Sequence, residues 1–212
     1  MSKLARDDEE RLIARSQRGD IEAFNELVLQ YQQTMFGAVF RMLGDYDAAA
    51  DVTQDAFMAA FRGIRSFHGG APFRAWLLRI GSNMACDHWR RVQRHPAESL
   101  EVLTDEDEPH SSEILSSLAA TGLEGNPEAS ILSQELQELI QRGLQHLPLD
   151  QRVAVVLCDI EGLSYEEVAE ATQSTLGTVR SRISRGRAKL RNYLSRYREL
   201  LPRNYRLTSK DD

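Results

Sequence analysis

The sequence predicts an all-α protein with two small helical domains joined by a flexible acidic linker, the second domain containing a helix-turn-helix. Three observations predict it. Apolar residues recur at three- and four-residue steps on both sides of residues 95–126, which are acidic and weakly periodic. Residues 162–198 carry the start signals of two helices close together. With 212 residues, 42% of them hydrophobic, the chain has room for two small cores.

The helix-turn-helix is predicted from local capping signals. Ser164 and Glu167 have the spacing of a capping box, and Thr175 is a suitable N-cap for the second helix. The helical repeat places two groups of residues on different sides of that second helix. One group is Leu176, Val179, Ile183, Gly186 and Leu190, and the other is Thr178, Ser181, Arg182, Arg185 and Lys189. One apolar face and one basic, hydrogen-bonding face are typical of a DNA-reading helix.

The charge of this helix favours DNA binding over the alternative of a basic surface helix that contacts only solvent. Eight basic residues and no acid fall between positions 176 and 198. A solvated helix usually mixes both signs, because opposite charges one turn apart attract each other. Ser and Thr among the arginines could reach base edges and phosphates. We therefore expect a nucleic-acid interface.

The net charge of −6 conceals a division of the chain into blocks. Residues 62–94 contain seven arginines and a single acid, Asp87. Residues 95–141 contain eleven acids and neither Lys nor Arg. Two basic blocks are thus separated by an acidic one, a pattern compatible with nucleic-acid binding.

Three helices are predicted at the start of the chain. The first is a leader helix within 1–20 around Leu12 and Ile13, and the second is a strongly periodic helix over 21–43. The third covers 48–64 and is capped by Asp47. The carboxylates of Asp45, Asp47, Asp51 and Asp55 could suggest a metal site, but no His or Glu completes a ligand set. Helix caps and a polar docking face explain them better.

Residues 66–72 form a predicted loop, because Gly69, Gly70 and Pro72 prevent helix continuation. Residues 73–91 then form one long helix or two abutting ones, in which aromatic residues alternate with arginines. This mixture suits single-stranded nucleic acid, whose bases stack on aromatic rings. Phe73 and Trp76 are expected in the core, whereas for Trp89 core and surface remain equal alternatives.

Residues 95–126 have a composition that argues against a stable fold of their own. Pro127 is placed to open a helix over 128–146, Asp150 to cap the next helix, and Gly162 to end it. Val153, Val156, Leu157 and Ile160 are the residues expected to point inward from that next helix.

Enzyme, metal and cofactor motifs are absent from the sequence. There is no P-loop, GxSxG or HExxH pattern, and the five histidines have no ligand spacing. Cys86 and Cys158 have no CxxC partners and are expected to be small core residues. No apolar run is long enough to span a membrane and no signal core is present, so we expect a soluble, cytoplasmic, non-enzymatic protein without membrane insertion.

Two groups of motifs resemble a known family. The segments LPLDQRV (147–153), GLSYEEVA (162–169) and GTVRSRISRGRA (177–188) resemble domain four of bacterial sigma factors of the extracytoplasmic-function group. The segments DVTQDAF (51–57), FRAWLLRI (73–80) and NMACDHWRR (83–91) resemble domain two. The resemblance implies a leader helix (1–20), domain two (21–94), the acidic linker (95–126), domain four (127–198) and a C-terminal tail (199–212).

The resemblance also implies the function and its residues. A sigma factor binds core RNA polymerase, through its clamp coiled coil and flap, and directs initiation at promoters. The expected polymerase contacts are Asp51, Gln54 and Asp55. The expected minus-ten contacts, with melted DNA, are Phe67, His68, Asn83, Asp87, Trp89, Arg90 and Arg91. The expected minus-thirty-five contacts, in the major groove of duplex DNA, are Thr178, Arg180, Ser181, Arg182, Ser184, Arg185 and Lys189. Arg182 and Arg185 are the choices for guanine or phosphate contacts.

The family further implies an anti-sigma factor as a partner, and a linker that threads through the polymerase channel later occupied by RNA. Family members often have a bulkier residue where Ser184 stands, so no upstream base preference is predicted. The alternative function is a free-standing helix-turn-helix regulator that acts without polymerase. The basic, aromatic block at 62–94 argues against it, because a plain repressor would not need that block.

Overall fold

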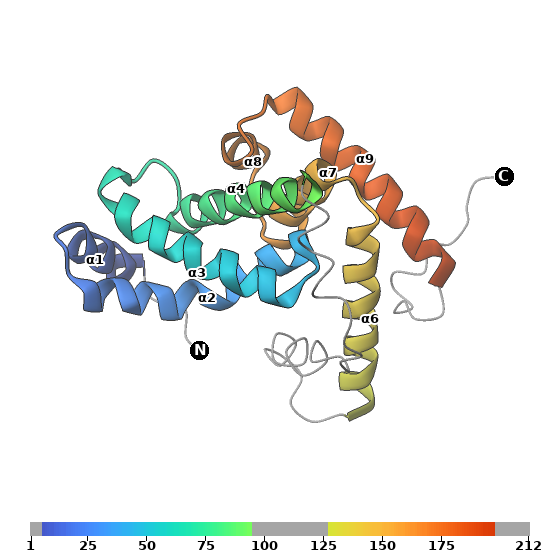
Figure 1. The fold of residues 1–212 in the computed structure, drawn as a ribbon, viewed down its shortest axis with the longest axis horizontal. Helices are drawn as coiled ribbons and strands as arrows, with labels where there is room; N and C mark the ends of the chain where they lie inside the picture. The colour runs from blue at the N-terminus through green and yellow to red at the C-terminus, as the bar shows by residue number, and fades with distance from the viewer. Residues whose placement is uncertain (1–5, 95–126, 198–212) are drawn as a thin grey trace.

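The computed structural model describes residues 6–94 and 127–197, and every regular element within those two ranges is helical (Figure 1). The predicted acidic linker, 95–126, lies outside the described residues. The N-terminal module consists of α1 (Arg6–Gln17), α2 (Ile21–Leu43), α3 (Tyr46–Gly63), the 3-10 turn η1 (Ile64–Ser66) and α4 (Phe73–Arg94). The C-terminal module consists of α6 (Pro127–Gln145), α7 (Leu149–Val155), the π-helical turn η3 (Val156–Ile160), α8 (Tyr165–Ala171), α9 (Leu176–Leu194) and the 3-10 turn η4 (Ser195–Tyr197).

Helix α2 is the centre of the N-terminal module and has the bounds predicted from its period. Asp20 caps its start by accepting a hydrogen bond from the Ala23 amide at 3.1 Å. Gly44 ends it in a left-handed conformation (φ +82°) that lets its N–H reach the Phe40 carbonyl at 2.8 Å. The apolar face, including Leu27 and Met35, is buried against α1, α3 and α4.

The helices around α2 differ from the prediction in one cap. Helix α3 begins two residues earlier than predicted, because Asp45 rather than Asp47 is its N-cap and accepts from the Ala48 amide at 2.7 Å. The alternative between one and two helices after the loop is resolved, since α4 is continuous. Phe73 and Trp76 are buried as predicted.

Helix α1 shares the core of the N-terminal module. Leu12 and Ile13 are buried, as their place in the leader helix predicted. The Tyr31 hydroxyl donates a hydrogen bond to the Glu9 carboxylate, and burial followed by this acidic neighbour raises the pKa of Tyr31. The leader helix is thus packed on α2.

The C-terminal module folds around a short buried helix, α7. The predicted cap at Asp150 is wrong: Pro148 occupies the N-cap position, and the Asp150 side chain binds Arg182 instead. Val153, Val156 and Leu157 are buried as predicted, but Ile160, the last residue of the π-helical turn η3, is exposed. The predicted stop at Gly162 is confirmed by its positive φ of +69°.

Side chains of the two modules pack together. Helix α6 contacts both α2 and α9, and α8 contacts α4, which it crosses (Figure 1). The side-chain amide of Gln141 donates to the Phe40 carbonyl at 3.1 Å, and that of Gln145 to the Arg41 carbonyl at 3.3 Å. The buried apolar residues of both modules form one continuous cluster. The contact is therefore part of the folded structure of this chain.

Helix α9 can approach α7 only because position 186 lacks a side chain. A β-carbon at Gly186 would lie 2.6 Å from Val155 Cγ2 and 3.3 Å from the Gln151 carbonyl oxygen. We predict that Gly186→Val lowers the free energy of unfolding by about 2 kcal/mol or more, since α9 would have to move away from α7. Urea denaturation followed by circular dichroism measures the loss.

Gly177→Val provides the matched control in the same helix. The nearest atom to its β-carbon would be Thr175 Oγ1 at 3.9 Å, which is ordinary contact. Equal unfolding midpoints for the two variants would contradict the packing described for α7 and α9.

Candidate nucleic-acid interface

The helix-turn-helix is built from two capped helices and a tight turn. Ser164 Oγ accepts from the Glu167 amide at 3.2 Å, and the Glu167 carboxylate accepts from the Ser164 amide at 2.7 Å, so the predicted capping box is confirmed. Thr175 caps α9 as predicted, accepting from the Thr178 amide at 3.2 Å. Gln173 takes a positive φ of 49° in the turn between them. These caps hold α9 in place relative to α8.

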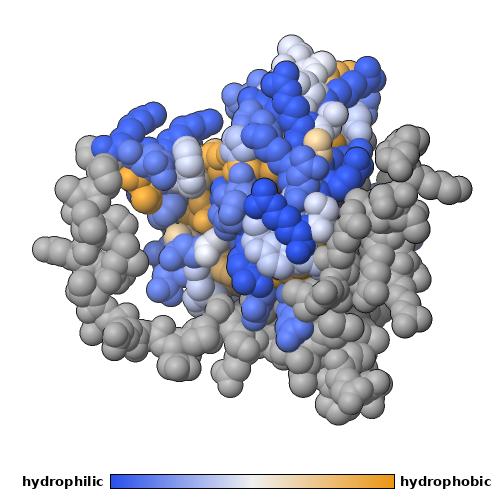
Figure 2. All heavy atoms as spheres, turned by 90° about the vertical axis from the view of Figure 1, so that its right-hand side faces the viewer, coloured by the Kyte–Doolittle hydropathy of each residue, from blue (hydrophilic) through white to orange (hydrophobic). Residues whose placement is uncertain are grey.

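The inner face of α9 follows its period except at the first residue. Val179, Ile183 and Gly186 are buried, whereas Leu176 is exposed. Leu176 is the first residue of the helix, where no residue of α7 or α8 covers it closely. The remaining surface of α9 carries the exposed residues among those predicted to contact the minus-thirty-five element, here called the upstream element: Thr178, Arg180, Ser184, Arg185 and Lys189. Hydrophilic residues predominate on the face of the molecule seen from the α6 and α9 side (Figure 2).

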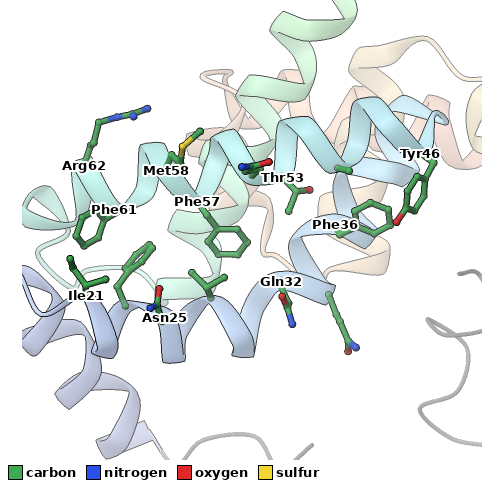
Figure 3. Close-up of a pocket in the computed structure, with 15 residues that line it drawn as sticks. Ile21, Asn25, Gln32, Phe36, Tyr46, Thr53, Phe57, Met58, Phe61 and Arg62 are labelled. Carbon is green, nitrogen blue, oxygen red and sulfur yellow. The ribbon is translucent and has the colours of Figure 1, made fainter. Parts of the chain in front are cut away.

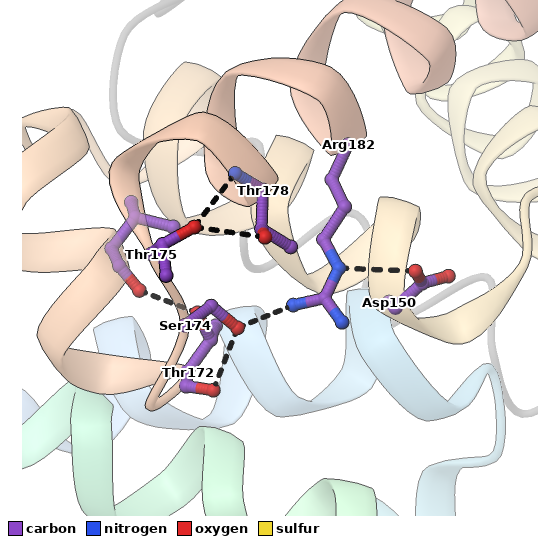
Figure 4. A network of polar contacts seen from close by, with 7 residues as sticks. Asp150, Thr172, Ser174, Thr175, Thr178 and Arg182 are labelled. Carbon is purple, nitrogen blue, oxygen red and sulfur yellow. Dashed lines mark hydrogen bonds and ion pairs between the residues drawn. The ribbon is translucent and has the colours of Figure 1, made fainter.

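Arg182 differs from the other members of that set because it is bound within the protein. Its Nε donates to Asp150 Oδ2 at 3.0 Å and its Nη1 to Ser174 Oγ at 2.7 Å, and the side chain is 28% exposed (Figure 4). Ser181 is half-buried. Arg187 likewise pairs with Asp159 at 2.9 and 2.5 Å. Arg185 is exposed and has no ion pair within the described ranges.

The sequence interpretation missed the partners of Arg182. Asp150 was predicted as a cap, and Ser174 received no role. A carboxylate on α7 and an arginine more than thirty positions later have no local pattern that joins them. Only the packing of α7 against α9 brings the two side chains together.

The residues predicted to contact the melted minus-ten strand, which we call the strand-reading residues, lie on α4 and on the loop before it. Asn83 and Trp89 are half-buried, and His68, Asp87, Arg90 and Arg91 are exposed. Asp87 and Arg90 form an ion pair at 2.9 Å along the helix. The structure thus places six of the seven candidates at least partly on the surface of α4 or of the loop.

Phe67, the remaining candidate, packs into an aromatic cluster. Its ring centroid lies 5.3 Å from that of Phe73 and 5.5 Å from that of Trp76. Its carbonyl accepts a hydrogen bond from the Gln17 side chain at 2.6 Å. The half-buried Phe67 therefore anchors the loop to α4 and α1, and Gln17 is a supporting residue for which the sequence had no signal.

The predicted polymerase-docking residues lie beside an apolar groove. Asp51, Gln54 and Asp55 are all exposed on α3. Gln54 lines a groove of about 810 Å³ between α2 and α3, together with Phe36, Phe57 and Met58 (Figure 3). Thr53 Oγ1, buried in the same lining, has no hydrogen-bond partner. The sequence interpretation missed this groove, although apolar Met58 on the outward side of its helix was a signal.

Two cavities are each lined by residues of the strand-reading region and by residues of the C-terminal module. A cavity of about 360 Å³ is lined by His68, Gly70, Trp76 and Arg79 from the N-terminal module and by Glu167 and Glu170 from α8. A second cavity, of about 420 Å³, brings Asn83, Asp87 and Arg90 together with Asp150 and Arg182. Cys86 also lines the second cavity, and burial raises the pKa of its thiol.

Within the described residues, no three His, Cys, Asp or Glu side chains are grouped as metal ligands. Cys86 and Cys158 are both free and half-buried. Among the helices that the structure describes, none combines the length and apolarity needed to cross a membrane.

Comparison with known families gives two matches in chain order. The sigma-70 region 2 family matches residues 27–95, and the sigma-70 region 4 family matches residues 137–190. The first match spans most of α2 to α4, and the second spans the helix-turn-helix.

Known proteins and solved structures agree with these matches. The chain is 37% identical to the RNA polymerase sigma-H factor of Pseudomonas aeruginosa over 87% of its own length and 92% of the relative. It is 38% identical to the ECF RNA polymerase sigma-E factor of Escherichia coli, over 85% and 91% respectively.

Two solved structures have a similar fold and 26% sequence identity. The sigma factor RpoE from Bartonella quintana, in complex with the anti-sigma factor NepR, has a TM-score of 0.60 over 81% of this chain and 96% of its own. CnrH, in complex with the cytosolic domain of CnrY, has a TM-score of 0.59 over 88% and 97%. With both family regions present in order on an all-helical fold, this chain belongs to the extracytoplasmic-function sigma factors of bacterial RNA polymerase.

Proposed function

We propose that the chain binds core RNA polymerase and directs it to promoters, reading the minus-thirty-five element as duplex with α9 and the minus-ten element as a melted strand with α4 and its loop. The observation that carries this proposal is the presence of two differently built basic surfaces in one chain. The division into domains at 21–94 and 127–198 is part of it. A sigma factor needs no catalytic group of its own, and we place its action in the cytoplasm with the polymerase.

The groove between α2 and α3 is the surface we assign to the polymerase clamp coiled coil. Phe36, Phe57 and Met58 offer apolar contact, and Gln54 adds an exposed amide on the rim. Asp51 and Asp55 lie exposed on the same helix, where they can select a basic partner. An apolar centre with a polar rim is the usual composition of a protein interface.

The exposed face of α9 is the surface we assign to the upstream element. A helix of this type lies in the major groove, where arginine recognises guanine O6 and N7. Arg185 is free to do so, with Thr178, Arg180, Ser184 and Lys189 around it. Ser181 is half-buried, and Arg182 is bound to Asp150 and Ser174 before DNA binds.

The strand-reading surface is assigned to α4 and residues 66–72. Capture of a base from the strand costs a few kcal/mol of unstacking, which aromatic and amide contacts offset. His68 and Trp89 provide ring faces, Asn83 an amide, Asp87 an acceptor, and Arg90 and Arg91 the phosphate contacts. Phe67 supports the loop from beneath.

An anti-sigma factor is proposed as a further partner. The two structural neighbours were solved in complexes with NepR and with the cytosolic domain of CnrY. Two small modules joined by a long segment present surfaces that one such protein could cover together. No observation favours the alternative of a regulator that works without polymerase.

The experiment that tests the function is reconstituted transcription on genomic fragments. We expect the purified chain alone to bind promoter DNA poorly, and the addition of core polymerase to yield sequence-specific transcripts whose amount falls with salt. Footprinting of the same complexes locates both elements. Tight, specific binding without polymerase would overturn the proposal.

Arg185→Ala is predicted to weaken use of the upstream element by about 1–3 kcal/mol, because one base contact is lost. Arg187→Ala is the matched control, since it removes the same charge from the same helix at a residue already paired with Asp159. Transcription from promoters with base changes in the upstream element measures the contact. An Arg185→Ala protein that responds to those changes as the wild type does would exclude this contact.

Met58→Asp is predicted to weaken core-polymerase binding about tenfold, because a charge is placed in the apolar docking groove. Met58 is 44% exposed, so the fold should tolerate the change. Leu29→Asp is the control, because Leu29 is also exposed, at 57%, and does not line the groove. Equal affinities of the two variants, measured by fluorescence titration with core polymerase, would remove the groove from the interface.

A further inference from the structure

Arg182 connects three parts of the C-terminal module. It lies on the second turn of α9, and its Nε donates to Asp150 on the first turn of α7. Its Nη1 donates to Ser174, which lies in the turn between α8 and α9 (Figure 4). All three residues belong to the same module, so these bonds do not depend on the N-terminal one. One guanidinium therefore joins α9 to the turn before it and to a neighbouring helix.

The turn before α9 needs support of this kind. Gln173 has a positive φ of 49°, a conformation that residues other than glycine keep only where surrounding contacts maintain it. The Ser174 amide donates to the Ala169 carbonyl at 2.9 Å, and its hydroxyl donates to the Thr172 carbonyl at 3.1 Å. The same hydroxyl oxygen accepts from Arg182 at 2.7 Å. Arg182 thus holds the last residue of the turn, directly before the cap of α9.

Asp150 determines where the guanidinium points. It accepts from Nε, so it holds the planar group by one edge and fixes its plane. The two side chains are 50% and 28% exposed, and an ion pair as open as this contributes little to folding stability. Its effect is on geometry. A recognition helix has to enter the major groove in a defined orientation if several of its side chains are to reach base edges together.

We propose that Arg182 is a positioning residue for the upstream element, which acts through Asp150 and Ser174 to fix the direction of α9 and not through a bond of its own to a base or a phosphate. This inference rests on the proposed function, since it takes α9 as the duplex-reading helix. A helix that is held in its binding orientation loses less freedom when DNA binds. The pairing therefore improves the reading done by Thr178 and Arg185.

Exchange of the two charges separates positioning from DNA contact. In the reconstituted holoenzyme, Arg182→Glu and Asp150→Arg each place like charges together. We expect each to lower the discrimination between a promoter fragment and the same fragment with base changes in the upstream element, by about threefold to tenfold. The double variant restores an attractive pair and should discriminate within about twofold of the wild type. A contact of Arg182 with DNA cannot be restored in this way, because a carboxylate in its place repels phosphates.

Asp150→Arg combined with Arg185→Glu is the matched control. It has the same net charge as the exchanged pair and changes the same two helices, but the ion pair of Asp150 is with Arg182. We expect no restoration in this control. Failure of the exchanged pair to restore discrimination would overturn the proposal, and so would equal restoration by the control.

The salt dependence of promoter binding by the holoenzyme gives a second readout. Loss of a phosphate contact reduces the slope of log affinity against log salt concentration by about one. Arg182→Gln should lower discrimination and leave this slope close to that of the wild type. Asp150→Asn, which keeps Arg182 and removes the charge of its partner, should lower discrimination to a similar extent. A slope reduced by about one in Arg182→Gln, or unchanged discrimination in Asp150→Asn, would overturn the positioning role.

Two further measurements separate this inference from a loss of folding and from the proposed function. Thermal unfolding followed by circular dichroism should give similar midpoints for the wild type and both amide variants, because the pair is exposed. If the wild type gives no polymerase-dependent transcription, the proposed function fails. If the wild type transcribes and discriminates while the variants behave as it does, only the positioning role fails.

Discussion

The packing of this protein depends on one buried cation, Arg152. Its guanidinium donates to the carbonyls of Gln145 and Leu147 at 3.0 and 3.1 Å, where α6 ends and α7 begins, and to the Met42 carbonyl at 2.5 Å, near the end of α2. The last turns of two helices leave their carbonyls without intrahelical donors, and this one side chain supplies donors to both ends. Burial lowers the pKa of Arg152, and these carbonyl acceptors compensate for the hydration that its guanidinium loses. The same residue thus shapes the C-terminal module and joins it to the N-terminal one.

The function depends on which arginines are left without a partner. Arg182 and Arg187 lie on α9 beside Arg185, yet each is bound to an aspartate of α7 or η3, whereas Arg185 has no such partner among the described residues. On α4, Arg74 and Arg79 are bound to Glu161 and Glu170. A basic helix is therefore not uniformly available to nucleic acid. The acidic residues of the folded modules decide where a phosphate or a base can be bound, which the net charge of −6 does not show.

The local features were predictable from the sequence because their causes are local. The capping box of Ser164 and Glu167, the cap at Thr175 and the period of α2 each involve residues within a few turns, and all are found as predicted. The predicted cap at Asp47 was wrong because Asp45 has the same side chain, and it is Asp45 that has the extended backbone of an N-cap. Asp150 was misassigned because its partner lies on another helix. Neither the contact between the modules nor the groove between α2 and α3 was predicted from the sequence. Both depend on how helices that are distant in the sequence pack against each other.

The buried apolar residues of the two modules form one continuous cluster, and the distance between the modules in solution tests this packing. Double electron–electron resonance between spin labels at the exposed positions Arg18→Cys and Arg191→Cys, with the two native cysteines replaced by serine, measures the separation directly. We expect a single narrow distance distribution for the free chain, because Arg152 and the shared core fix one module on the other. A broad distribution would contradict this packing.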